Sequence, residues 1–126
     1  MLLDTNFLVC YSGQSKRLPR SRAVEFLRQH KAAPLYVSRV SVLEFTAGMD
    51  TAAQATRHLA GFGVLPVDEI IRLEATNAFR HLRRAGLKIG VADTLIAATA
   101  LNYGLPVVTE NAGHFGRLPG LTVLAY

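Results

Sequence analysis

The sequence has a single cysteine, no long apolar run and no basic segment at its start, and each of these shortages argues against a class of protein. The single cysteine among 126 residues, Cys10, cannot form an intramolecular disulfide. A small domain held together by disulfides is therefore excluded, and the sequence predicts a protein of the reducing cytoplasm. No apolar run reaches the ~18 residues that a membrane-spanning helix needs, so no membrane association is expected. The apolar start lacks the preceding basic segment of a signal peptide.

Acidic residues are also scarce. Nine Asp and Glu stand against 14 Lys and Arg, which gives a net charge of +5 and a pI near 9.9. This balance favours a polyanionic partner, either nucleic acid or an acidic protein. Three of the nine acids nevertheless lie in hydrophobic sequence, namely Asp4, Glu44 and Asp93. A lone carboxylate in such surroundings is costly unless it is paired or bound to a cation, so these three predict a site for a hard divalent metal.

Short apolar runs alternate with amphipathic segments along the whole chain, which predicts one α/β domain over residues 1–126. Strands are expected at residues 1–3, 35–37, 64–67 and 106–109, with a fifth if 121–125 also pairs. Helices are expected around residues 6–11, 22–30, 39–47, 52–60, 68–85 and 91–103. Pro66 favours an edge position for the third strand, and Val24 is expected to face inward. The alternation predicts a central parallel sheet with helices on both faces.

The order of these strands decides whether the acids meet. In an order 3-2-1-4-5, the first and fourth strands are neighbours, and Asp4 ends the first while Thr109, Glu110 and Asn111 follow the fourth. Ligand sites of open α/β sheets lie outside the carboxyl ends of the strands. Glu44 lies on the helix after the second strand, and Asp93 in the first turn of the helix before the fourth. All of these side chains are then expected to converge on one cleft, where Mg²⁺ or Mn²⁺ suits their oxygen ligands.

Each acid also has a purely structural alternative. Asp4 can cap the turn that follows it. Glu44 can be the last member of a capping box begun by Ser41. Asp93 can be an acid that the helix dipole favours near a helix start.

Four segments resemble those of PIN-domain nucleases, in the same order along the chain. They are residues 2–6 (LLDTN), 41–45 (SVLEF), 89–98 (IGVADTLIAA) and 107–115 (VVTENAGHF), the last followed by LPGL. The size and arrangement are most similar to VapC toxins of toxin–antitoxin pairs. The resemblance implies a PIN-like three-layer sandwich and a Mg²⁺- or Mn²⁺-dependent endoribonuclease. It further implies a homodimer that is neutralised by a small VapB-like antitoxin.

The resemblance also carries residue roles to matching positions. Asp4, Glu44 and Asp93 match the metal-binding acids, and Thr5, Asn6 and Thr109 match residues that order or border the site. Asn111 stands where the family often has a fourth acid and cannot supply a negative charge. This substitution motivates an alternative hypothesis, in which a PIN-like module binds RNA or protein with weak or no catalysis. A phosphatase with Asp4 as nucleophile would need an acid at position 6, which is asparagine.

Basic residues near the acids are candidates for RNA binding. Arg80, Arg83, Arg84 and Lys88 precede Asp93 and either follow an RNA backbone or form a solvated helix face. His114 and Arg117 lie close to the fourth strand and are candidates for phosphate contacts.

Overall fold

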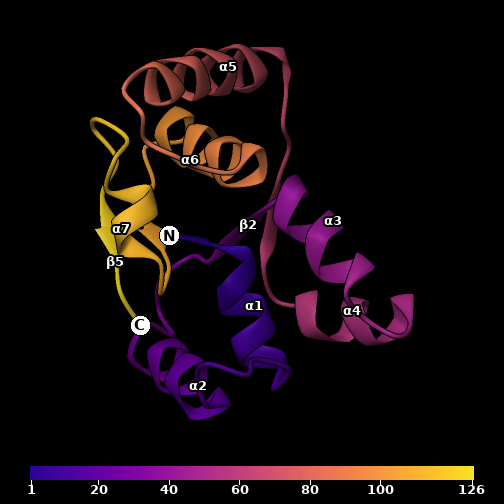
Figure 1. Ribbon diagram of the computed structural model, residues 1–126. Coiled ribbons are helices and arrows are strands. Elements are labelled where there is room, and N and C mark those ends of the chain that lie inside the picture. Colours follow the sequence, from indigo (N-terminus) through magenta and orange to yellow (C-terminus); the bar gives the residue numbers. More distant parts are fainter.

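Five short parallel strands form the centre of the computed structural model, which describes residues 1–126 (Figure 1). The strand order is β3-β2-β1-β4-β5, as predicted. The strands are β1 (Leu2–Leu3), β2 (Tyr36–Ser38), β3 (Gly63–Leu65), β4 (Val107–Val108) and β5 (Val123–Leu124). In the register, Leu2 is paired with Tyr36 on one side and with Val107 on the other. The first and fourth strands are therefore neighbours, and their carboxyl ends lie side by side.

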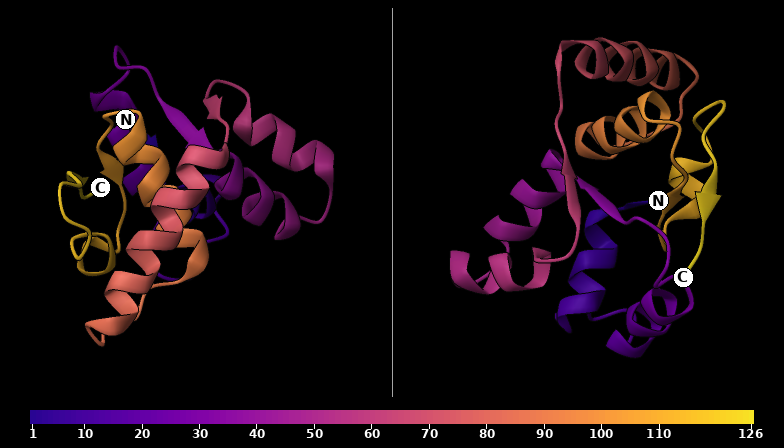
Figure 2. Two further views of the ribbon diagram at one scale, coloured as in Figure 1. Left: turned by 90° about the horizontal axis from the view of Figure 1, so that it is seen from above. Right: turned by 180° about the vertical axis from the view of Figure 1, so that it is seen from behind.

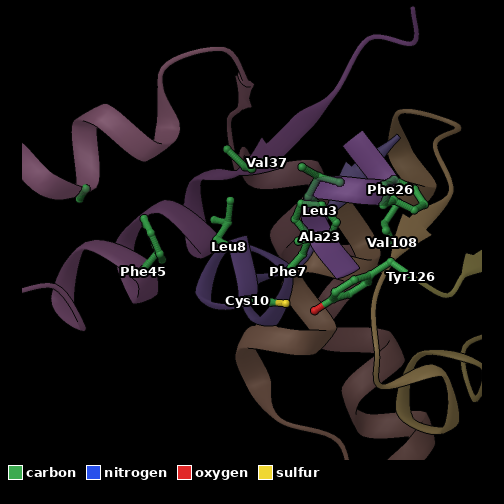
Figure 3. Packing of buried hydrophobic residues seen from close by; sticks show 11 residues of the cluster. Leu3, Phe7, Leu8, Cys10, Ala23, Phe26, Val37, Phe45, Val108 and Tyr126 are labelled. Carbon is green, nitrogen blue, oxygen red and sulfur yellow. The ribbon is translucent and has the colours of Figure 1, made fainter. Parts of the chain in front are cut away.

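Helices cover both faces of this sheet (Figures 1 and 2). They are α1 (Thr5–Ser12), α2 (Arg20–Gln29), α3 (Arg39–Ala47), α4 (Ala52–Leu59), α5 (Glu69–Arg84), α6 (Val91–Asn102) and α7 (Ala112–Phe115). Successive strand residues point to opposite faces. Leu3 and Val108 accordingly pack into the core beneath α1 and α2 (Figure 3), whereas Leu2 and Val107 pack into the core beneath α6.

The apolar helix α6 lies in the interior, as its composition predicts. Ile96 and the residues that follow it to Ala100 are all fully or almost fully buried. Helix α5 covers α6 with one apolar face, on which Ile71 and Leu82 are buried. Each such buried side chain contributes roughly 1.5–3 kcal/mol of transfer free energy. These contacts fix the position of the first turn of α6, which carries Asp93.

Local signals set the helix starts. The Asp68 carboxylate accepts a hydrogen bond from the Ile71 N–H at 2.9 Å and begins α5. The Ser38 hydroxyl accepts one from the Val40 N–H at 3.3 Å and begins α3. Because α3 starts at Ser38, Ser41 is not an N-cap, and the capping-box interpretation of Glu44 is wrong. The Glu44 side chain remains available for another role.

Several expectations need correction. Val24 was expected to face inward but is 43% exposed, because the buried stripe of α2 runs through Ala23 and Phe26 and leaves Val24 on the neighbouring face. The third strand ends at Leu65, before Pro66, but lies at the sheet edge as predicted. The short helix α7 was not predicted, because its four residues are too few for a periodic pattern. None of the helices is both long and apolar enough to span a membrane.

Candidate active site

Asp4 lies where β1 ends and α1 begins, and it is only 2% exposed. Its Oδ1 accepts a hydrogen bond from the N–H of Phe7 at 2.7 Å, so the residue does cap α1. Its Oδ2 accepts a hydrogen bond from the hydroxyl of Thr109 at 2.5 Å. The capping interpretation therefore accounts for one oxygen only. The second oxygen is oriented by a residue that is distant in sequence, at the end of the neighbouring strand.

Thr109 and Asn111 form the second part of this network. The Thr109 hydroxyl, which is fully buried, donates to Asp4 and accepts the N–H of Asn111 at 2.9 Å. Donor and acceptor capacity of the hydroxyl are thus both used, which fixes its orientation. Asn111 contributes its backbone here and stands at the start of α7. The Thr109 hydroxyl and the Asn111 backbone therefore belong to the same hydrogen-bond network as Asp4.

Glu44 reaches the same region from α3. Its Oε2 accepts a hydrogen bond from the hydroxyl of Thr5 at 2.5 Å, and Thr5 directly follows Asp4. The interaction confirms that the first loop and the third helix meet here. Asn6 is exposed and makes no side-chain hydrogen bond. The structure therefore gives Thr5 a supporting contact and gives Asn6 none.

Asp93 in the first turn of α6 forms the third corner of the site. Its Oδ2 lies 3.8 Å from Nδ1 of His114 on α7, which is longer than a hydrogen bond. The His114 Nδ1 atom is buried and has no hydrogen-bond partner. Gly90 rather than Asp93 is the N-cap of α6, and no side-chain oxygen caps this helix. Asp93 therefore keeps both oxygens free for another ligand.

The three carboxylates influence each other electrostatically. The pKa of Asp4 is raised to about 7, mainly by burial and also by the charges of Asp93 and Glu110, while the hydrogen bonds from Thr109 and Phe7 oppose this rise. Burial also raises the pKa of Asp93, and the charge of Glu44 adds to this effect. No Lys or Arg forms an ion pair with Asp4, Glu44 or Asp93. The site thus gathers negative charge without a protein cation to balance it.

This donor set suits a hard divalent cation, although it is not a closed metal cage. No group of three or more His, Cys, Asp or Glu side chains lies close enough to hold a metal ion in the present side-chain arrangement. The available donors are carboxylate oxygens, which Mg²⁺ and Mn²⁺ prefer. Carboxylates that repel one another remain ionised together only when a cation compensates them. The chemistry of these oxygen donors therefore fits such an ion.

Glu110 follows Thr109 at the end of β4 and was expected to converge on the same cleft, although no catalytic or metal-binding role was assigned to it. Its side chain is 14% exposed and lies 3.8 Å from Nη1 of Arg17 in the loop between α1 and α2. Its charge raises the pKa of Asp4, so it lies near the site although Asn111 stands at the expected fourth position. Its orientation depends on the end of β4.

The basic candidates separate into different places. Arg80, Arg83 and Arg84 lie on α5, and Lys88 lies in the loop before α6. Arg117 follows α7, and its Nη1 donates a hydrogen bond to the backbone carbonyl of Lys88 at 2.6 Å. The Arg117 guanidinium thus joins two segments of the protein. That contact assigns it a structural role which the sequence did not indicate.

Comparisons with known proteins agree with this arrangement. The family model described as "PIN domain" matches residues 1–121. The chain therefore belongs to the PIN domain family.

Several similar proteins are toxins or toxin–antitoxin complexes, or ribonucleases named VapC. The chain is 42% identical over 87 residues to Ribonuclease VapC10 of Mycobacterium tuberculosis; the match covers 68% of this chain and 65% of that protein, slightly less than two thirds of its length. The structure of VapBC2 from Rickettsia felis bound to a promoter DNA fragment superposes with a TM-score of 0.82 at 22% identity, over 99% of this chain and 97% of that one. A toxin–antitoxin complex from Klebsiella pneumoniae gives a TM-score of 0.73 at 25% identity, over 98% and 94%.

Proposed function

We propose that this protein is a Mg²⁺- or Mn²⁺-dependent endoribonuclease and the toxin of a VapBC-like toxin–antitoxin pair. The observation that carries the proposal is the gathering of Asp4, Glu44 and Asp93 from three distant segments without a Lys or Arg to balance them. A protein that used these acids only for folding would be expected to pair them. The similarity to a ribonuclease of the PIN family supports the same activity. Acting on cellular RNA, the protein would work in the cytoplasm.

In this proposal the three acids hold the cation. A bound divalent cation supplies Lewis-acid stabilisation of the charge that develops on a phosphodiester during hydrolysis. Thr109 and Thr5 keep the carboxylates of Asp4 and Glu44 oriented, through hydrogen bonds of 2.5 Å each. His114 stands 3.8 Å from Asp93, where it can contact a phosphate of the substrate. The overall positive charge attracts the rest of the RNA backbone.

Cleavage assays on purified protein test the activity. Transfer, ribosomal and messenger RNA would be incubated with Mn²⁺, with Mg²⁺ and with EDTA, and the ends would be mapped. We expect metal-dependent cuts with 5′-phosphate and 3′-hydroxyl ends, and no cuts by Asp4→Asn or Asp93→Asn. Asp50→Asn, which changes an exposed acid outside the site, is the matched control and should cut normally. Metal-dependent cleavage by both site variants would refute the proposal.

The same assay separates the alternative of a binding module. A non-catalytic module would shift the mobility of intact RNA at saturating Mn²⁺ and never shorten it. The Asn111 side chain motivates this comparison, because it brings no negative charge to the place of a fourth acid. If an Asn111→Asp variant cuts RNA faster than the natural protein, the asparagine lowers the rate of cleavage.

We further propose two protein partners. The similarity to a toxin–antitoxin complex supports a small VapB-like antitoxin. Exposed apolar side chains on α3 and α5, including Leu43 at 70% and Ile70 at 59% exposure, support a homodimer. Expression with and without the small open reading frame immediately upstream tests the first partner, with growth arrest expected only without it. Light scattering tests the second, and a monomer at micromolar concentration would exclude it.

A further inference from the structure

A groove between α5 and α6 is not part of the carboxylate site. Its volume is about 450 Å³, and α5 lies along the outer side of α6 (Figures 1 and 2). The apolar part of its lining includes Phe79 from α5, and Val91 and Leu95 from α6. Val91 is 61% exposed although it is apolar, so the groove leaves an uncovered hydrophobic surface.

A second cavity of about 460 Å³ adjoins the first, because Phe79 and Arg83 line both. It extends past Leu87 and Lys88 in the loop between the two helices. Leu87 is 40% exposed. The two cavities therefore form one groove with an aromatic side chain at its middle, referred to below as the α5–α6 groove.

The rim of the α5–α6 groove is cationic. Arg72, Arg80 and Arg83 line it, and only Arg72 has an acidic partner, Glu69 at 2.5 Å. Arg80 and Arg83 form no ion pair, and neither does Lys88. A ligand that complements this surface has a flat apolar part for the floor and negative charges for the rim. A nucleotide within a single-stranded nucleic acid meets both requirements.

The groove also ends beside the proposed reacting centre. Val91 and Thr94 line it, and Asp93 lies between them in the first turn of α6. Asp93 itself is directed toward His114, and its Oδ2 lies 3.8 Å from the Nδ1 of that residue. A strand whose phosphate reaches the carboxylates can therefore continue around this turn into the groove.

We propose that the α5–α6 groove binds one nucleotide of the RNA strand next to the cleaved phosphate. The base lies against Phe79 and Val91, and the flanking phosphates pair with Arg80 and Arg83. The inference rests on the proposed ribonuclease function and adds a binding subsite to it. Among the basic residues predicted to bind RNA, Arg80, Arg83 and Lys88 line this groove, whereas Arg84 lines neither cavity.

The test compares two probes with equal charge. One is a uridine dodecamer of RNA, and the other is the same chain of ribose and phosphate without bases. Binding would be measured by fluorescence anisotropy in an Asp4→Asn background, so that no cleavage interferes. Stacking of one base on an aromatic side chain contributes about 1–3 kcal/mol, and uracil can stack like any other base. The Asp4→Asn protein should therefore bind the dodecamer with bases roughly tenfold more tightly than the chain without bases.

Further substitutions in the Asp4→Asn background test which residues cause this preference for the probe with bases. Phe79→Leu keeps apolar volume and should abolish the preference, and Val91→Ser, at an exposed position, should reduce it without affecting folding. Arg80→Ala and Arg83→Ala should weaken both probes by a similar factor. Arg57→Ala, which removes an exposed arginine from α4, is the matched control and should bind both probes as before.

The outcomes separate this proposal from the proposed function. A natural protein that cuts RNA, together with groove variants that bind both probes unchanged, would overturn the subsite alone. A protein that neither binds nor cuts RNA would overturn both. Groove variants that lose self-association or antitoxin binding, with RNA binding intact, would assign the groove to a protein interface and overturn the subsite.

Discussion

Ionisation of Asp4 has opposite effects on stability and on the proposed activity. The ionised carboxylate destabilises the metal-free protein, whereas the proposed activity requires it. Asp4 is buried next to other acids, and its pKa is raised from 3.8 to about 7 mainly by desolvation. The folded protein therefore binds a proton more tightly than the unfolded chain. The stabilisation from this difference is fully present below the unfolded pKa and is lost as the pH rises through the folded value. Without metal, the free energy of unfolding should fall between about pH 4 and about pH 7.

The Asp4→Asn substitution should remove much of this dependence. One pKa unit corresponds to about 1.4 kcal/mol, so the raised pKa of Asp4 accounts for a fall on the order of 4 kcal/mol. Asparagine is neutral. Its side-chain oxygen can still accept the Phe7 N–H, while its amide nitrogen would donate to the Thr109 hydroxyl, which reverses that bond. Urea unfolding in EDTA at pH 7.5 should therefore find the variant more stable than the natural protein. Saturating Mg²⁺ should make the natural protein the more stable of the two. If the natural protein in EDTA were equally stable at pH 5 and pH 7.5, the raised pKa of Asp4 would be contradicted.

Thr109 is expected to matter through Asp4. Thr109→Val removes the hydroxyl that donates to Asp4 Oδ2 and leaves the Asn111 N–H without its acceptor. An unsatisfied buried group costs about 1–3 kcal/mol, so the variant should be destabilised by that amount. The pKa of Asp4 should rise further, which should weaken Mn²⁺ binding at pH 7 in a calorimetric titration.

Thr99→Val is the control for this effect. Thr99 is also fully buried, but its hydroxyl donates to the backbone carbonyl of Leu95 at 2.8 Å, away from the acids. It should lose stability without losing Mn²⁺ affinity. Equal affinity in Thr109→Val and the natural protein would show that Thr109 does not orient Asp4.

At the scale of elements, the loop before α6 is held by the segment that follows α7. The guanidinium of Arg117 donates to the carbonyl of Lys88, across 29 positions of sequence, at 2.6 Å. This contact lies at the entry to the helix that carries Asp93, and α7 carries His114. The tie therefore joins the two elements that face each other across one side of the site.

Arg117→Met should release that tie while keeping most of the side-chain volume. Hydrogen exchange of the amides in residues 86–92 should become roughly twofold to tenfold faster, as expected for a lost local stability of about 0.5–1.5 kcal/mol. RNA cleavage should decrease while global unfolding changes little. Arg28→Met breaks a surface pair with Glu25 and should leave both measurements unchanged. Unchanged exchange in the Arg117 variant would exclude the bracing role.

Elements also differ in how far local sequence determined them. The apolar composition of α6 predicted burial, and Asp68 predicted the start of α5, because both signals act within a few residues. Val24 was misplaced because Ala23 and Val24 have similar local signals, and only contact with the sheet selects the buried face of α2. Helix α7 has four residues and depends on the end of β4 for its position.

At the scale of the whole molecule, the net charge of +5 should make RNA binding sensitive to salt. If Arg80, Arg83 and Lys88 each neutralise one phosphate, the logarithm of the affinity should fall with the logarithm of salt at a slope of roughly −2. Affinity for the uridine dodecamer should then decrease roughly tenfold to twentyfold from about 50 mM to about 200 mM salt. An uncharged methylphosphonate chain of equal length is the control. Binding that is insensitive to salt would contradict a phosphate-based contact.

The sequence by itself determined the α/β class and singled out the three acids of the candidate site, whereas the strand order was predicted together with the PIN-like fold. Hydrophobic periodicity and the cost of an unpaired acid in apolar sequence are local properties, so they can be read from neighbouring residues. Tertiary structure alone decided which hydroxyl orients each acid: Thr109 meets Asp4 across 105 positions, and Thr5 meets Glu44 across 39. It also made the α5–α6 groove. Such contacts depend on strand register and helix packing, which bring together residues that share no local pattern.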